Sequence, residues 1–109
     1  GNVITNITGI TERRVDMMFG IGYSDDIDKA QQILEDIVNS HDRVLQEPTP
    51  VVKLHELGDS SVNFVCRPWV KPEDYWDVYF ATYEGCKLAL DKAGIEIPYP
   101  HSVEIHKEA

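Results

Sequence analysis

The sequence predicts an α+β fold, a ferredoxin-like βαββαβ sandwich in which two helices lie on one face of a mixed or antiparallel sheet. Two segments carry apolar residues at helical spacing. The segments around them alternate between apolar and polar residues with the period of two typical of half-buried strands, and Gly and Pro clusters separate the segments. A chain of 109 residues has the length of one domain, so we expect a single core.

Composition narrows the function classes. The formal net charge is −9 and the 10 Lys and Arg residues are scattered, which argues against a nucleic-acid partner. The longest nearly uncharged apolar run, Met17–Tyr23, is far shorter than the roughly 20 residues that a membrane helix needs. Cys66 and Cys86 lack the spacing of a metal or redox site and are expected to be reduced core residues. Gly1 opens the sequence without Met, which favours a fragment of a longer protein.

The first strand is expected over residues 14–23, after a linker over residues 1–12. Gly20 and Gly22 fall on its second face, where they either admit a close neighbour or mark a β-bulge. The residues expected on its buried face are Val15, Met17, Phe19, Ile21 and Tyr23.

The first helix is expected to begin at the capping residues Ser24, Asp25 and Asp26 and to end near Asn39 or Ser40. Its apolar stripe comprises Ile27, Ala30, Ile33, Leu34, Ile37 and Val38.

A β-hairpin is predicted next, with strands over 51–57 and 61–70 around the turn Gly58-Asp59-Ser60. A loop over 43–50, closed by two prolines, leads into it. Pro68 indicates an edge or the end of the second strand. One face of that strand carries Val62, Phe64 and Cys66, and the other carries Asn63, Val65, Arg67 and Trp69.

The second helix is expected to start at Pro72, with acidic residues complementing the helix dipole in its first turns, and to stop at Gly94. Its predicted core stripe comprises Trp76, Tyr79, Phe80, Tyr83, Cys86, Leu90 and Ala93.

Residues 94–101 are expected to form a hinge between this helix and a last strand over 102–106. Gly94 suits the left-handed position after a helix, while Pro98 and Pro100 prevent the helix from continuing and favour extended backbone at Tyr99.

The residue pattern indicates no catalytic residue, no cofactor and no metal site. Asp25, Asp26 and Asp28 are explained by helix capping, and a divalent-metal site there lacks the pattern of a calcium loop. His101 and His106 fall on opposite faces of the last strand, against a zinc site. No nucleophile or phosphate-loop motif is present in the sequence.

Three aromatic residues, Trp69, Tyr75 and Trp76, gather around the start of the second helix. They are either anchors of a protein interface or, alternatively, Trp76 belongs to the core and Trp69 covers a loop. The residues we assign to subunit contact or to the hinge are Trp69, Tyr75, Trp76, Pro98, Tyr99 and Pro100.

Four stretches, in this order, span most of the chain: Tyr23-Ser-Asp-Asp-Ile-Asp28, Val52-Lys-Leu-His-Glu-Leu-Gly58, Ser60-Ser-Val-Asn-Phe-Val65 and Gly94-Ile-Glu-Ile-Pro-Tyr-Pro100. Together they resemble the cytoplasmic C-terminal region of the small-conductance mechanosensitive channel family. The resemblance implies that residues 1–12 end a preceding β-domain and that residues 13–109 form an α/β domain of a cytoplasmic vestibule.

The resemblance further implies a homo-heptamer below an inner-membrane pore that releases ions and small osmolytes on hypo-osmotic shock. The membrane segments are absent from this chain, so its own role would be structural and that of a permeation filter. The acidic charge would then favour cations at the portals, or it serves only solubility. The alternative is a free-standing ferredoxin-like regulatory module that binds a small ligand, which an upstream membrane segment in the parent protein would argue against.

Overall fold

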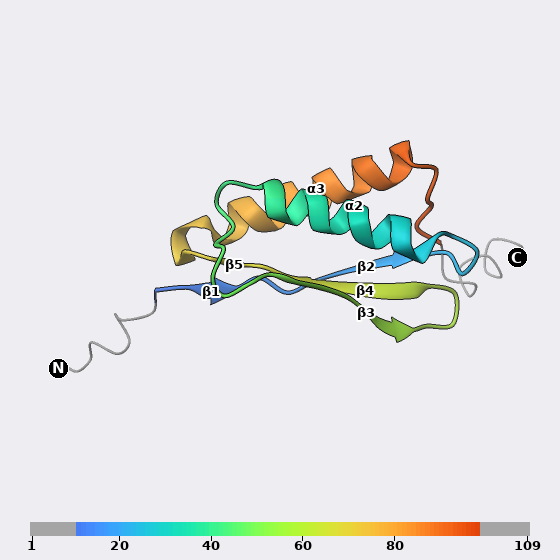
Figure 1. Ribbon diagram of the computed structural model, residues 1–109, viewed down its shortest axis with the longest axis horizontal. Helices are drawn as coiled ribbons and strands as arrows, with labels where there is room; N and C mark the ends of the chain where they lie inside the picture. The colour runs from blue at the N-terminus through green and yellow to red at the C-terminus, as the bar shows by residue number, and fades with distance from the viewer. Residues whose placement is uncertain (1–10, 99–109) are drawn as a thin grey trace, which may run out of the picture.

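The structure is a computed structural model, and it describes residues 11–98. Two helices lie on one face of antiparallel strands, so the domain has two layers (Figure 1). The strands form a two-stranded sheet, β1–β5, and a three-stranded sheet with the order β2–β4–β3. The elements are β1 (Arg13–Arg14), β2 (Met17–Ile21), α2 (Ile27–Ser40), β3 (Val51–Leu57), β4 (Val62–Arg67), β5 (Trp69–Val70), the 3-10 turn η1 (Pro72–Asp74) and α3 (Tyr75–Lys92). The predicted α+β fold is confirmed, and the strand expected over 102–106 lies outside the described residues.

Two of the predicted strands are each broken in two. The strand expected over 14–23 becomes β1 and β2, and the one expected over 61–70 becomes β4 and β5. Both breaks occur at the same place, where the Val15 N–H donates to the Pro68 carbonyl at 2.8 Å. Pro68 has no N–H of its own, so the regular ladder cannot continue through it. The chain therefore forms two short sheets in series.

The residues that were predicted to form the buried face of the first strand are buried, except Tyr23, and so is one face of the second hairpin strand. Val15, Met17, Phe19 and Ile21 are buried, as are Val62, Phe64 and Cys66 on β4, and the α2 residues Ala30, Leu34 and Val38 pack against them. The prediction was wrong at Tyr23, which is exposed and does not belong to the buried face. Its hydroxyl donates a hydrogen bond to the Gly58 carbonyl in the β3–β4 turn. Tyr23 thus tethers the chain after β2 to the hairpin.

Gly20 admits a close neighbour and does not mark a bulge. The register of β2 against β4 is regular, with Gly20 opposite Asn63, and the irregularity in this sheet lies in β3 between Leu54 and Glu56. A Cβ on Gly20 would lie 2.8 Å from the Asn63 Oδ1 atom, closer than real Cβ contacts. That Oδ1 atom accepts a 2.8 Å hydrogen bond from the Ser61 hydroxyl. The glycine therefore makes room for a polar side-chain network.

Three of the four rows of residues spaced four apart along α3 differ clearly in burial. The buried row is Val78, Thr82, Cys86 and Leu90. A half-buried row contains Tyr75, Tyr79 and Tyr83, and an exposed row contains Trp76, Phe80, Glu84 and Leu88. The predicted core stripe was wrong at Trp76 and Phe80, which are 58% and 63% exposed. Smaller side chains face the core instead, and a Cβ on Gly85 would lie only 3.4 Å from Ile37 of α2, so the two helices lie close together.

The predicted helix stop at Gly94 is confirmed. Gly94 has φ of +80°, a conformation that L side chains rarely adopt. Its N–H donates to the Asp91 carbonyl at 3.0 Å, and the Ile95 N–H donates to the Leu90 carbonyl at 2.9 Å, which is the Schellman pattern. Of the predicted hinge residues, Pro98 is described and Tyr99 and Pro100 lie outside the described residues.

Candidate functional site

The most distinctive surface of the described domain is an aromatic face on α3, formed by Tyr75, Trp76, Tyr79, Phe80 and Tyr83. Its rings contact one another continuously: the centroids of Trp76 and Phe80 stack at 5.7 Å, those of Tyr75 and Trp76 meet edge to face at 4.8 Å, and those of Tyr79 and Tyr83 lie 4.9 Å apart. These separations and angles are those that aromatic pairs prefer. The rings therefore present one connected apolar surface to solvent.

Tyr83 anchors the inner border of this face to the sheet. Its ring lies 4.9 Å from that of Phe19, and its hydroxyl accepts a hydrogen bond from the Met18 backbone N–H at 3.3 Å. Burial raises the pKa of Tyr83 above the usual value for a tyrosine, although the N–H of Met18 acts in the opposite direction. At the other end the Arg13 guanidinium lies 4.2 Å above the Tyr75 ring. The face is therefore held at both ends by strands.

Two ion pairs flank the face within residues 11–98. Arg43 contacts Asp77 at 2.6 Å, and Lys87 contacts Asp91 at 2.7 Å. Glu84, in the exposed row between Phe80 and Leu88, makes no ion pair or side-chain hydrogen bond among residues 11–98. An unpaired carboxylate thus sits beside the apolar surface.

Of the four predicted contact or hinge residues that lie within residues 11–98, the structure brings Tyr75 and Trp76 together and leaves Trp69 and Pro98 apart from them. Tyr75 and Trp76 adjoin each other in the aromatic face, and the exposure of Trp76 rules out its alternative placement in the core. Trp69 lies on β5, where its carbonyl accepts a hydrogen bond from Leu45 at 2.8 Å, and it joins none of the aromatic pairs formed within residues 11–98. Pro98 lines a hollow of about 470 Å³ at the end of α3.

Sequence reasoning missed Phe80 as a surface residue because it assigned it to the core, whereas Tyr79 and Tyr83 do pack against the core with one side of their rings. A signal was present: aromatic residues recur four apart at 75, 79 and 83 and again at 76 and 80. Two adjacent aromatic rows on one helix exceed what one core-facing stripe accommodates.

The described part of the chain shows no cluster of metal-binding side chains and no reactive thiol. Within residues 11–98 no three His, Cys, Asp or Glu side chains are grouped so that they could hold a metal ion. Burial raises the pKa of both Cys66 and Cys86 to about 12, so neither thiol is a nucleophile at neutral pH. A second hollow of about 230 Å³ lies between Met18, Val65, Arg67 and Tyr83. Of the helices described, neither is both long and apolar enough to cross a membrane.

Comparison with known proteins gives this surface a context. The family model described as "Mechanosensitive ion channel MscS, C-terminal" matches residues 15–97, which include every described strand and helix except β1. The chain belongs to the MscS family. This confirms the resemblance seen in the four sequence stretches, and the family is one of ion channels.

Relatives within the MscS family are similar over nearly the whole chain. An uncharacterized MscS family protein of Synechocystis is 46% identical over 99 residues, which is 91% of this chain and 33% of that protein. The small-conductance mechanosensitive channel of Edwardsiella ictaluri is 39% identical over 106 residues, 97% of this chain and 36% of that protein. The chain thus spans about a third of the length of the MscS relatives it matches.

Solved MscS structures share the fold. Helicobacter pylori MscS in its closed state matches with a TM-score of 0.77 and 30% sequence identity, over 84% of this chain and 36% of that one. Arabidopsis thaliana MSL1 matches with a TM-score of 0.72 over 85% of this chain and 36% of that one, at 12% identity. The second likeness shows the fold alone.

Proposed function

We propose that this chain is the α/β part of the cytoplasmic vestibule of a mechanosensitive channel of the inner membrane. Residues 1–12 would end a preceding β-domain and residues 13–109 would form the vestibule domain. The channel would open under bilayer tension and release ions and small osmolytes on hypo-osmotic shock. The domain would have no catalytic task, and would build the wall through which the permeating ions and osmolytes pass.

The observation that carries this proposal is the aromatic face of α3. Trp76 and Phe80 stay exposed in the isolated domain although their rings are among the most costly to leave in water. Exposed aromatic clusters with charged rims are typical of protein interfaces. In an MscS family member this favours self-association into the walls of a homo-heptameric vestibule.

Electrophysiology of the full-length channel tests the proposal. The gene would be expressed in a bacterial host that lacks its own mechanosensitive channels, and membrane patches would be stretched by suction. We expect tension-activated currents and survival of osmotic downshock. A protein that reaches the membrane yet gives neither current nor protection would contradict the proposal.

The filter role has a separate test. The net charge of −9 on each copy would concentrate cations near portals between copies, within a screening length of about 8 Å at physiological salt. Reversing two exposed acidic residues, Asp36→Lys and Asp59→Lys, should lower the ratio of cation to anion permeability. An unchanged reversal potential would assign the charge to solubility instead.

A further inference from the structure

We infer that in the proposed ring the aromatic face of α3 in one copy docks against the β3 edge of the next copy, with Glu84 of the first copy paired to Lys53 of the second. This inference rests on the proposed self-association and names the two surfaces that would meet. The occupant of the aromatic face is thus a second copy of this chain.

The two surfaces lie on opposite sides of the domain. On one side α3 covers β2, as the contact from Met18 to Tyr83 shows. On the other side α2 covers β3, where the Gln31 Nε2 atom donates to the Val52 carbonyl at 2.9 Å. The sheet order β2–β4–β3 places β2 and β3 at opposite edges (Figure 1). A ring of identical copies needs two different patches that face in different directions, whereas a self-complementary patch closes as a dimer.

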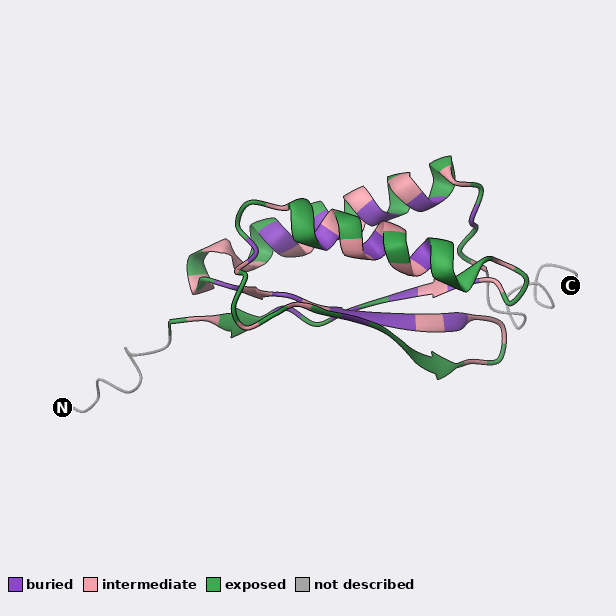
Figure 2. Cartoon of the chain, in the orientation of Figure 1, coloured by how far each residue is buried: buried purple, intermediate pink, exposed green. Residues whose placement is uncertain are grey.

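The β3 edge is an uncovered surface with apolar content. Figure 2 shows β3 exposed along almost its whole length, unlike its neighbour β4. Val51, Leu54 and Leu57 are exposed, and no strand among residues 11–98 pairs with the outer side of β3. Unpaired strand edges tend to be covered by another element or another chain. The β3 edge therefore offers apolar area to match Trp76 and Phe80.

Charge complementarity selects the pairing. Glu84 follows Phe80 by four residues in the exposed row of α3 and has no charged partner within the described chain. Lys53 is exposed on β3 and also makes no ion pair with any residue from 11 to 98. A lysine brought to this row would meet a carboxylate and, one helical turn away, the Phe80 ring, and both attract an ammonium group.

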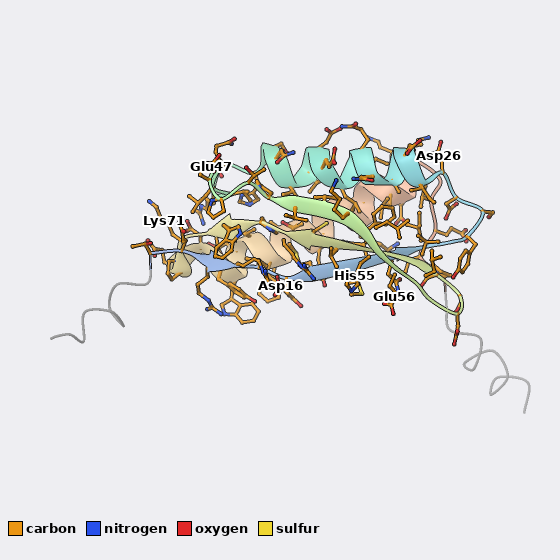
Figure 3. All side chains as sticks on the ribbon, turned by 60° about the horizontal axis from the view of Figure 1, so that its bottom comes forward. Asp16, Asp26, Glu47, His55, Glu56 and Lys71 are labelled. Carbon is orange, nitrogen blue, oxygen red and sulfur yellow. The ribbon has the colours of Figure 1, made fainter. Side chains whose placement is uncertain are left out.

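The acidic residue of β3, Glu56, already has a partner within the domain. In Figure 3 His55 and Glu56 are labelled on the side of the sheet away from α2. The Glu56 Oε1 atom accepts a hydrogen bond from the Asn63 Nδ2 atom at 3.3 Å. Lys53 is therefore the charge on β3 that remains for a neighbouring copy.

Cysteine cross-linking in the full-length channel, in membranes, tests the geometry. The variants are Phe80→Cys, Leu54→Cys and the double variant, and the native Cys66 and Cys86 are both buried and so do not react. Docking of two different faces predicts no cross-link in either single variant and a ladder of covalent multimers in the double variant. Cross-linked dimers of Phe80→Cys alone would show that the aromatic face pairs with itself and would overturn the inference.

Charge reversal tests the ion pair. Glu84→Lys and Lys53→Glu should each lower the ring fraction several-fold in native mass spectrometry, and the double reversal should restore it. Asp42→Lys is the control for Glu84→Lys, because the Asp42 side chain is 93% exposed and undergoes the same change from carboxylate to ammonium. Single reversals that behave like this control would overturn the pairing.

The outcomes separate this inference from the proposed function. A tension-gated ring in which the double cysteine variant forms no ladder contradicts the docking and leaves the channel assignment intact. A full-length protein that neither conducts nor forms a ring contradicts both.

Discussion

The hydroxyl of Tyr83 on α3 accepts a hydrogen bond from the backbone N–H of Met18 on β2 at 3.3 Å. Since β2 is an edge strand of the three-stranded sheet as described over residues 11–98, no described strand pairs with this N–H on that side, and the helix supplies an acceptor. One side chain thus closes an exposed sheet edge and fixes the aromatic face above it.

Tyr83→Phe should remove the hydroxyl that accepts the hydrogen bond from the Met18 N–H and keep the aromatic ring beside Phe19. We expect a loss of about 1 kcal/mol in the free energy of unfolding, the usual net value of such a bond. Hydrogen exchange at the Met18 amide should become faster. Tyr75→Phe, which leaves the Met18 contact in place, is the control, and equal exchange at Met18 in both variants would count against the edge-closing role.

Alkaline pH should destabilise the domain through its buried thiols. Burial raises the pKa of Cys66 and Cys86 from 9.0 to about 12 in the folded state, so between these values the thiols ionise only when the chain unfolds. The two thiols contribute fully to the free energy of unfolding below pH 9. As the pH rises toward 12, this free energy falls by about 1.4 kcal/mol per pH unit for each thiol. Urea unfolding at several pH values measures this slope.

The double variant Cys66→Ala/Cys86→Ala provides the control for that slope. Its baseline stability will be lower, because two buried side chains are truncated. Its dependence on pH above 9 should nevertheless be flatter than that of the unmodified chain. Parallel curves would show that other groups cause the alkaline loss.

Gly20→Ala should destabilise the domain by roughly 1–3 kcal/mol, since its Cβ would lie 2.8 Å from the Asn63 Oδ1 atom. Adding Asn63→Ala should recover much of that loss by removing the obstructing atom. Gly94→Ala is a contrasting control: its cost, about 1–2 kcal/mol, comes from φ of +80° with nothing within 4 Å, so Asn63→Ala should not rescue it. A Gly20 cost that is independent of residue 63 would refute the steric explanation.

Thr82→Val should stabilise the domain. The Thr82 side chain is 1% exposed, and its Oγ1 atom has no hydrogen-bond partner in the described structure. Replacing the hydroxyl by a methyl group of similar size removes the penalty of an unpaired buried polar atom, about 1–3 kcal/mol. Thr82→Ser keeps the hydroxyl and should destabilise instead. A lower melting temperature for the valine variant would disprove this account.

Local chemistry accounts for what could be predicted from the sequence. The Asp26 side chain accepts a hydrogen bond from the Lys29 N–H at 3.1 Å at the start of α2, and Gly94 ends α3, both as expected. The predicted turn after β3 is closed by the Gly58 N–H, which donates to the Ser61 carbonyl at 2.7 Å. Caps and turns depend on a few neighbouring residues, which is why they could be predicted.

Tertiary packing determines which row of α3 is buried, and this could not be predicted from the sequence. Apolar or aromatic side chains recur four apart in three of the rows along α3, so periodicity did not distinguish the buried row from the exposed row. The choice depends on how closely α3 approaches α2 at Gly85 and Ile37, which no local pattern reports. The aromatic face could be suspected from Tyr75 and Trp76, but its partner surface on β3 needed the sheet order.

The break at Pro68 has a mechanical consequence. β1 and the C-terminal end of α3 lie at opposite ends of the long direction of the domain (Figure 1). A force applied between them would act along the strands, perpendicular to the hydrogen bonds that join them, and would load those bonds together in shear. Where the two sheets meet, the paired segments are held to each other by the 2.8 Å hydrogen bond from the Val15 N–H to the Pro68 carbonyl and not by a regular ladder, so we expect the domain to bend there first.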